Sequence, residues 1–259
     1  MSPFRTSTGR TLLSLALAVA AFAPKILAAQ SAETPKPVVA LTPGTAIYKA
    51  SLEIDGKLVP LDLARTVKLE KGAWVVTEVT TMSNYVAIDS AVLDRKTLVP
   101  RHRVLRDPTL TMDVQFAANT ATGTITARGQ TRPISIDMHG MLYADGPGSQ
   151  DAIAALPLRA GYSAEFLNFD SGSQQVSQLQ LRVLGTDTVT VPAGTFNTWK
   201  VLTVSATGGP GETAAYWIDK KTRRVVKFAS TLLEHNEIIA TAELTKSLGL
   251  PRRRCYVRG

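Results

Sequence analysis

The sequence predicts an all-β protein with one short helix, built as a sandwich or a barrel. Strand-like stretches rich in β-branched and aromatic residues recur about every eight to twelve residues, which is the spacing of antiparallel sheets. Residues 182–230 contain two successive β-hairpins, with turns at 191–194 and 219–222. A chain of 259 residues, of which 44% are hydrophobic, is long enough to bury a sizeable core in a single domain.

The turn at 191–194 carries the residues that a tight hairpin needs. Pro192 fixes φ at about −65° in the second position of a type I turn, and Gly194 can adopt the positive φ that a bulged hairpin requires. Val189 and Phe196 flank the turn with side chains that suit a half-buried sheet surface. We therefore assign structural turn roles to Pro192 and Gly194.

A short internal similarity links two further turns. Residues 92–97 resemble residues 217–222, because in each an Asp, a basic residue, a Lys and a Thr follow a strand. An Asp at the first turn position accepts hydrogen bonds from the backbone two residues on, while the basic side chains stay solvated. We assign turn roles to Asp94 and Asp219. The similarity is too short to establish a duplicated half-domain, since true repeats keep a fixed period.

The remaining elements follow from the same signals. Strands are expected at 46–54, 57–69, 73–82, 85–93, 98–106, 109–117, 124–127, 133–138, 162–169, 176–184, in the two hairpins and at 237–244. The one predicted helix covers residues 150–156, where Ser149 or Asp151 would cap its start and Pro157 would end it.

Residues 1–29 have the pattern of a secretory signal peptide. Two arginines precede an apolar run at 12–23, and two alanines at 28–29 mark a cleavage point. A retained membrane anchor is the alternative, but Pro24 interrupts the run well short of the about 20 residues that span a bilayer. We expect a signal peptide at 1–29, a flexible lead-in at 30–45, a single β-rich domain at 46–245 and a basic, disordered tail at 246–259.

The net charge of +8 comes from the two ends of the chain. Of the 29 Lys and Arg residues, three lie in 1–29 and five in 246–259, which leaves 21 basic and 21 acidic residues in the body. Nucleic-acid binding is therefore disfavoured, because it needs a basic face on the fold. Arg252, Arg253 and Arg254 could contact anionic lipid headgroups in a peripheral membrane contact, whereas a simply solvated tail is the favoured alternative.

The sequence carries no recognisable catalytic or metal motif. The histidines His102, His139 and His235 lie in different strands or turns, without the spacing of a zinc site, and His102 belongs to a basic strand expected to be solvated. Cys255 is the single cysteine, so no internal disulfide is expected. Nucleophile-elbow and phosphate-loop motifs are missing. We predict no metal, no cofactor and no enzymatic activity, although catalytic groups could still converge from distant strands.

The three tryptophans are the candidate ligand-lining residues. Trp74, Trp199 and Trp217 all fall within predicted strands. Aromatic side chains usually serve the core, each burying about 150–250 Å². Lining a cavity for a lipid or another apolar ligand is the functional interpretation, and a plain core role is the favoured alternative.

Three motifs resemble those of an uncharacterised family of secreted Gram-negative β-proteins that is labelled as a domain of unknown function. They are the LPLRAGY sequence at 156–162, the VPAGTF sequence at 191–196 and the YWID sequence at 216–219 with the basic strand after it. That family is similar to the LolA/LolB lipoprotein carriers. The resemblance covers about 47–244 and implies a LolA-like fold: an antiparallel open or incomplete β-barrel over a short helical lid, with an apolar cavity. It transfers no catalytic residue. The chain departs from LolB in lacking a lipid-anchoring cysteine at its mature start.

The resemblance and the missing catalytic motifs together predict a periplasmic, non-catalytic binding or carrier protein for a hydrophobic or amphipathic ligand, with a role in envelope maintenance. A structural or protein-binding module with a filled core is the alternative. An integral outer-membrane barrel is disfavoured by the 6% aromatic content, which leaves little for interfacial girdles. The oligomeric state is left open.

Overall fold

The computed structural model describes residues 35–54, 56–140, 142–170, 174–206, 213–232 and 238–249. All of them belong to the larger of two compact units, residues 31–259. The predicted signal peptide, the tail arginines Arg252–Arg254, Cys255 and the polar cluster around His235 lie outside the described residues.

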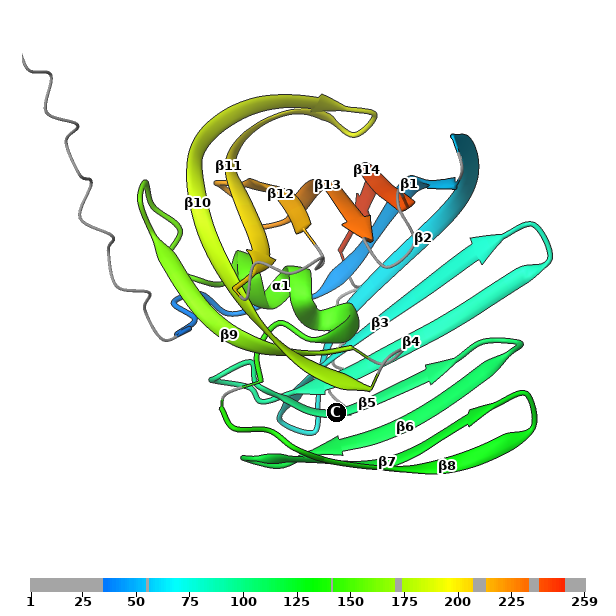
Figure 1. Ribbon diagram of the computed structural model, residues 1–259. Helices are drawn as coiled ribbons and strands as arrows, with labels where there is room; N and C mark the ends of the chain where they lie inside the picture. The colour runs from blue at the N-terminus through cyan, green and yellow to red at the C-terminus, as the bar shows by residue number, and fades with distance from the viewer. Residues whose placement is uncertain are drawn as a thin grey trace, which may run out of the picture. The chain divides into compact units, whose positions relative to one another are not determined.

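Within the described residues, one antiparallel sheet of 14 strands accounts for most of the fold (Figure 1). The strands are β1 (Gly44–Ile54), β2 (Lys57–Glu70), β3 (Ala73–Met82), β4 (Tyr85–Leu93), β5 (Pro100–Arg106), β6 (Leu110–Phe116), β7 (Thr120–Ala127), β8 (Gln130–Asp137), β9 (Ser163–Asp170), β10 (Gln175–Val191), β11 (Gly194–Ser205), β12 (Thr213–Asp219), β13 (Val225–Leu232) and β14 (Ile238–Leu248).

The sheet curls into a barrel that hydrogen bonds do not close. Its strand order is β8-β7-β6-β5-β4-β3-β2-β1-β14-β13-β12-β11-β10-β9, so two meanders meet where β1 pairs with β14. β8 and β9 are the two edges and do not pair with each other. The all-β class with one short helix and the open antiparallel barrel are thereby confirmed.

Side chains bring the two edges together instead. Phe116 on β6 and Phe169 on β9 lie edge to face with ring centroids 6.0 Å apart, in a cluster that also holds Met112, Ile134 and Leu142. These apolar contacts are non-directional, so they hold the two edges of the sheet together without a ladder of backbone hydrogen bonds.

Each edge strand is also protected. The Tyr143 N–H donates to the Leu167 carbonyl on β9 at 3.0 Å, and the Phe169 N–H donates to an Asp145 carboxylate oxygen at 3.1 Å. On β8, Pro133 interrupts the outer edge, which discourages pairing with another chain.

The short helix fills part of the barrel interior (Figure 1). A 3₁₀ turn, η1 (Gly146–Gly148), leads directly into α1 (Ser149–Ala154). Ile153 and Leu156 are fully buried in the principal core, among inward-facing side chains of β3, β4 and β9 to β13. The predicted caps were wrong: Gly148 is the N-cap and no side chain caps the helix, because η1 already supplies the preceding turn.

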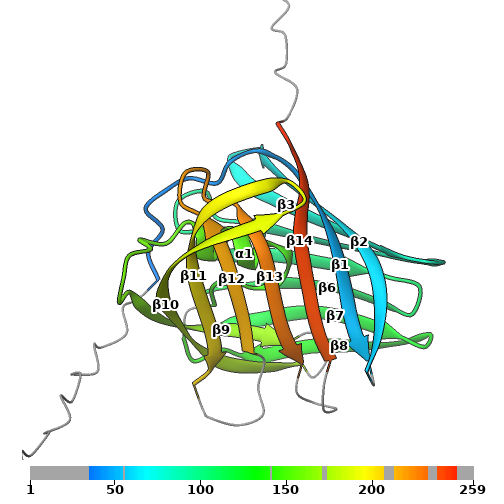
Figure 2. The same ribbon diagram turned by 90° about the horizontal axis from the view of Figure 1, so that it is seen from above.

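The second half of the sheet contains a long hairpin. Instead of two separate strands before residue 191, β10 runs unbroken for 17 residues, with a register shift between Val183 and Gly185 where it bends. Beyond the bend, the β10–β11 hairpin crosses over β12 to β14 on the side away from α1 (Figure 2). Its tip is fastened there, since the Ala193 N–H donates to the Leu244 carbonyl at 3.0 Å. Gly194 has φ +131°, and it pairs directly with Val191 without a bulge.

The two Asp turns share one geometry. The Asp94 carboxylate accepts the backbone N–H of Lys96 and Thr97, each at 2.8 Å, and these bonds lower the pKa of Asp94 to about 2. The Asp219 carboxylate accepts the Thr222 N–H at 2.9 Å. Four residues after each Asp, Leu98 and Arg223 adopt positive φ of 56° and 58°. The short sequence similarity thus corresponds to a repeated turn.

The domain boundaries differ from the prediction at both ends. Part of the predicted lead-in packs on the fold: the Val38 N–H donates to the Ala155 carbonyl at 2.8 Å, and Leu41 is buried in the core. The predicted tail is a strand as far as Leu248, because residues 246–248 continue the pairing of β14 with β1.

Candidate functional site

The candidate site is the barrel interior, and its main feature is how residues 142–162, the interior segment, are held there. Arg103 on β5 points inward and is only 9% exposed. Its Nη2 lies 2.7 Å from Asp89 Oδ2 on β4, and its Nη1 lies 3.3 Å from Asp145 Oδ2 at the start of η1. Burial raises the pKa of Asp145, and Arg103 opposes that rise. A buried charge pair therefore ties the interior segment to the wall.

A second arginine holds the helix itself. Arg65 on β2 donates to Glu78 Oε2 on β3 at 2.5 Å and to Gln150 Oε1 on α1 at 2.5 Å. Burial disfavours its charge, but Glu78, together with Tyr48 and Asp151, outweighs burial and raises the pKa of Arg65. Its guanidinium also lies 5.7 Å from the centroid of the Tyr48 ring.

The end of the helix meets a third arginine. Arg223 Nη1 donates to the carbonyls of Ala154 and Leu156 at 3.5 and 3.2 Å. A cation here satisfies carbonyls that the helix leaves free and faces the negative end of its dipole. Leu98, at the equivalent position of the other Asp turn, is instead buried in the principal core. The two similar turns therefore hold the interior segment by different chemistry.

Two glycines allow the interior segment to approach the wall closely. Gly146 has φ +58°, and a Cβ there would lie 2.6 Å from Arg103 Nε. A Cβ on Gly148 would lie 2.8 Å from a Leu93 methyl group. The GPG sequence is thus a packing requirement of this site as well as a loop signal.

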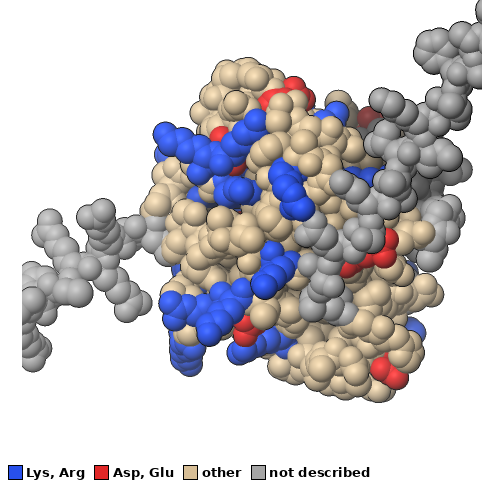
Figure 3. Space-filling view, turned by 90° about the vertical axis from the view of Figure 1, so that its left-hand side faces the viewer, with Lys and Arg blue, Asp and Glu red and all other residues tan. Residues whose placement is uncertain are grey.

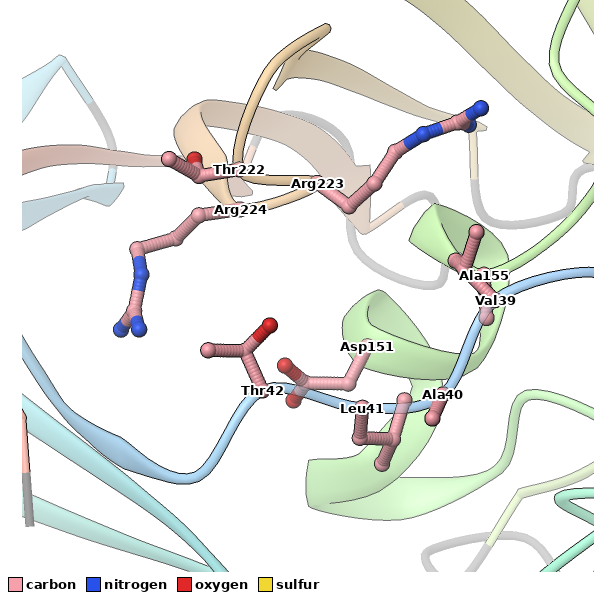
Figure 4. Close-up of a pocket in the computed structure, with 9 residues that line it drawn as sticks. All are labelled: Val39, Ala40, Leu41, Thr42, Asp151, Ala155, Thr222, Arg223 and Arg224. Atoms are coloured by element: carbon pink, nitrogen blue, oxygen red, sulfur yellow. The ribbon is translucent and has the colours of Figure 1, made fainter.

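A small pocket lies beside the helix (Figure 4). It encloses about 20 Å³, which is about the space of one water molecule. Asp151 Oδ2 is buried there without a hydrogen-bond partner among the described residues, and Arg65 Nε is 4.0 Å away. Burial raises the pKa of this carboxyl. In Figure 4 the Arg223 side chain points away from the pocket. The lining residues are Val39, Ala40, Leu41, Thr42, Asp151, Ala155, Thr222, Arg223 and Arg224. The pocket is too small for a lipid.

The other part of the interior is apolar and incompletely covered. On β1 and β2, successive side chains alternate between the two faces of the sheet. Every second residue from Tyr48 and from Arg65 therefore faces inward. Beyond them, toward the end of the barrel opposite to α1, these positions are apolar as far as the first residue of β2, the exposed Lys57. The apolar side chains are only half-buried, unlike the residues packed on α1. We call this set, together with Phe228 on β13, the open half of the interior; its β1 and β2 members are Ala50, Leu52, Val59, Leu61 and Leu63.

The three tryptophans do not come together. Trp74 is 5% exposed in the principal core, where its Nε1 donates to the Arg95 carbonyl at 3.3 Å. Trp199 packs against the same core, with Lys220 Nζ 4.5 Å from its ring centroid. Trp217 lies on the outer side of β12, and its Nε1 donates to Asp187 Oδ2 at 3.1 Å. None of them lines the described pocket, and their ligand-lining role stays a prediction.

Of the three histidines and the cysteine singled out in the sequence, His102 and His139 lie in the described part of the chain. In the part of the chain that the structure describes, no group of three His, Cys, Asp or Glu side chains could hold a metal ion. His102 Nε2 contacts Asp113 Oδ1 at 2.8 Å, and His139 is exposed. The expectation of a solvated basic strand was wrong for Arg103, because its side chain faces the interior.

The helical segments of the described residues are short. No helix there is long and apolar enough to cross a bilayer.

These features define an open β-barrel-like protein with an internal helix and an interior that is apolar on one side. The chain belongs to the protein family described as a protein of unknown function, DUF3108, whose model matches residues 48–232. The predicted membership in an uncharacterised β-protein family is thereby confirmed. A search of curated proteins finds no match to the chain.

One solved structure agrees with the fold. The chain is similar to a β-barrel-like protein of the domain of unknown function DUF1849 from Brucella abortus, with a TM-score of 0.56 and 10% identity, over 81% of this chain and 98% of that one. It also matches the hypothetical lipoprotein YmcC from Escherichia coli, with a TM-score of 0.34 and 9% identity, over 79% and 84% of the two chains. At such identities the first similarity shows the fold alone.

The arginines that hold the interior segment were not predicted from the sequence. A signal was present, because Arg65 interrupts an alternating apolar series on β2 in which Leu61, Leu63 and Val67 face inward. A charge at an inward position needs a buried partner. Which partner it finds depends on long-range packing, which a single sequence does not reveal.

Proposed function

We propose that this protein is a non-catalytic binding or carrier protein for a hydrophobic or amphipathic ligand, and that the ligand occupies the open half of the interior. The observation that supports this proposal is the incomplete burial of Leu52, Leu61 and Leu63 on the inward face of the barrel. Binding sites for such ligands are concave and mostly apolar. An occupant would remove these side chains from water, at about 25 cal/mol per Å² buried.

The structure also supports an asymmetric interior. The interior segment fills one part through buried charge pairs and the principal core, which leaves the ligand to the part lined by β1, β2 and β13. We propose that the protein works in the periplasm after export, which the signal-peptide pattern at 1–29 supports.

A pair of matched variants tests the proposed site. Leu61→Asp places a carboxylate in the open half, and it should weaken binding of the fluorescent apolar probe N-phenylnaphthylamine by about 10-fold or more, since a charge in an apolar site costs several kcal/mol. The measurement is a fluorescence titration of the purified protein, with circular dichroism melting to confirm that each variant is folded.

Ile88→Asp is the control. Ile88 lies on β4 next to the inward-facing Asp89, so it faces outward, and it is already 42% exposed. Its substitution should leave probe binding within about 2-fold of the unmodified protein, because an exposed position loses little on becoming charged. Equal weakening by both variants, or none by a folded Leu61→Asp, would remove the open half as the site.

A further inference from the structure

The end of the barrel that holds α1 is strongly basic. In an antiparallel meander, alternate turns lie at the same end. The β2–β3, β4–β5 and β12–β13 turns share this end with the start of β1 and the end of β14. We call this end of the barrel the basic end. Exposed basic residues lie in its turns and at the strand and helix ends beside them: Lys71, Arg95, Lys96, Arg101, Arg159 and Lys221. Figure 3 shows Lys and Arg side chains gathered on this face, with few Asp and Glu.

The acidic groups of these turns do not offset the charge evenly. Asp94 and Asp219 are engaged by their own turn backbones, and Asp94 also pairs with Arg101. Glu70, at the end of β2, is exposed and lies 3.9 Å from Lys68. Among the described residues, the turns at the opposite end carry both signs: Asp107 lies there beside Arg106, and Lys57 and Arg128 lie in or beside two further turns. The exposed cations at the end that holds α1 therefore outnumber the exposed carboxylates of its turns.

Apolar side chains accompany the basic ones. Val38, Leu69 and Leu248 are 58%, 42% and 41% exposed. They lie in the lead-in that packs on α1, at the end of β2 and at the end of β14, all of which belong to the basic end. Cations interspersed with exposed aliphatic side chains match a surface that has phosphate groups outside and hydrocarbon beneath. The phosphate backbone of a nucleic acid would use the cations alone.

The direction of the chain adds a second argument. β14 ends at Leu248 at this same end, and the sequence after it contains Arg252, Arg253, Arg254 and Arg258. The arginines that contribute to the net charge therefore follow, in sequence, a strand that ends at the basic end.

We propose that the basic end docks on an anionic phospholipid surface, with Lys96 and Lys221 among its contacts. This inference goes beyond ligand binding in the open half and does not depend on it, because the two sites lie at opposite ends of the barrel. In this orientation the open half faces away from the bilayer. Docking would then recruit the protein to the membrane surface and leave ligand exchange to the other end.

Vesicle co-sedimentation tests the proposal. The chain from Gln30 onward, which includes the whole unit 31–259, is mixed with phosphatidylcholine vesicles or with vesicles containing about one third phosphatidylglycerol. We expect partitioning only to the anionic vesicles, and a steep decrease between low salt and about 0.5 M NaCl, where exposed charges are screened. Lys96→Glu with Lys221→Glu should lower partitioning by at least about 10-fold, since each lysine near such a surface contributes roughly 5-fold.

The matched control makes the same change of charge at the other end. Lys57→Glu with Arg132→Glu alters two exposed residues, one beside the β1–β2 turn and one on β8. It should leave partitioning within about 3-fold. A third variant that ends at Gly249 should keep salt-sensitive binding, because the face on the body remains. Three results would overturn the proposal. They are equal losses of partitioning in the two charge variants, complete loss of partitioning on truncation alone, and binding to immobilised polyglutamate without binding to vesicles.

Discussion

Replacing Arg103 with methionine is expected to lower the free energy of unfolding by about 3–5 kcal/mol, because Asp145 would remain as a buried charge without a cation. Asp145 is 1% exposed, and its other contacts are the Phe169 N–H at 3.1 Å and the Asn168 side-chain amide at 3.4 Å. The measurement is urea unfolding followed by circular dichroism. Asp145→Asn in the Arg103→Met background should restore part of the loss, since a neutral amide is less costly to bury.

Arg101→Met is the matched control for that result. Arg101 lies two residues away on β5 and pairs with Asp94, but its side chain is exposed. Exposed pairs of this kind contribute about 0–1 kcal/mol. If Arg103→Met and Arg101→Met were equally mild, the interior segment would not depend on buried ion pairing.

Truncating Trp74 to alanine is expected to cost about 3–5 kcal/mol of stability, because its ring is buried in the principal core and the surrounding strands cannot collapse around the cavity. Thermal and urea unfolding of the purified variant measure this cost. Probe binding by the remaining folded protein should be unchanged, since Trp74 lies on the side of the core that packs with α1.

Trp217→Ala provides the comparison. Trp217 is half-buried on the outer side of β12, where it bonds Asp187 and lies under Lys200 and Lys227. Trp217→Ala should lower the free energy of unfolding by clearly less than Trp74→Ala does, because less apolar area leaves the interior. Reduced probe binding by a stable Trp217→Ala variant would instead support the predicted role of Trp217 as a ligand contact.

Much of the fold was predictable because its signals are local. Turn residues such as Gly194 and Asp219 mark where strands reverse, and alternation marks which side chains face inward. The sequence did not predict that β10 is one continuous strand through Gly185, since an isolated Gly suggests a strand end as readily as a bulge. The helix cap was also missed, because Ser149 and Asp151 have good cap chemistry but the 3₁₀ turn places them inside the helical segment.

The interior was harder to predict than the strands. Arg103 sits between Arg101 and His102 on one side and Val104 on the other, in a sequence that suggests a solvated strand, yet alternation turns it toward Asp145, which is 42 residues further along the chain. Charge balance was similarly misleading, since a neutral total conceals the basic residues that gather at the end holding α1. Both features arise from which distant strands and turns become neighbours, and that information is not contained in local patterns.

The central claim, that the open half of the barrel carries an apolar ligand, is tested most directly by native mass spectrometry of the protein purified from a cell envelope fraction without detergent. We predict a complex heavier than the bare chain, whose extra mass is lost on organic extraction and is identified as a lipid-like molecule. A spectrum showing only the bare chain, together with no binding of added apolar probe, would contradict the claim.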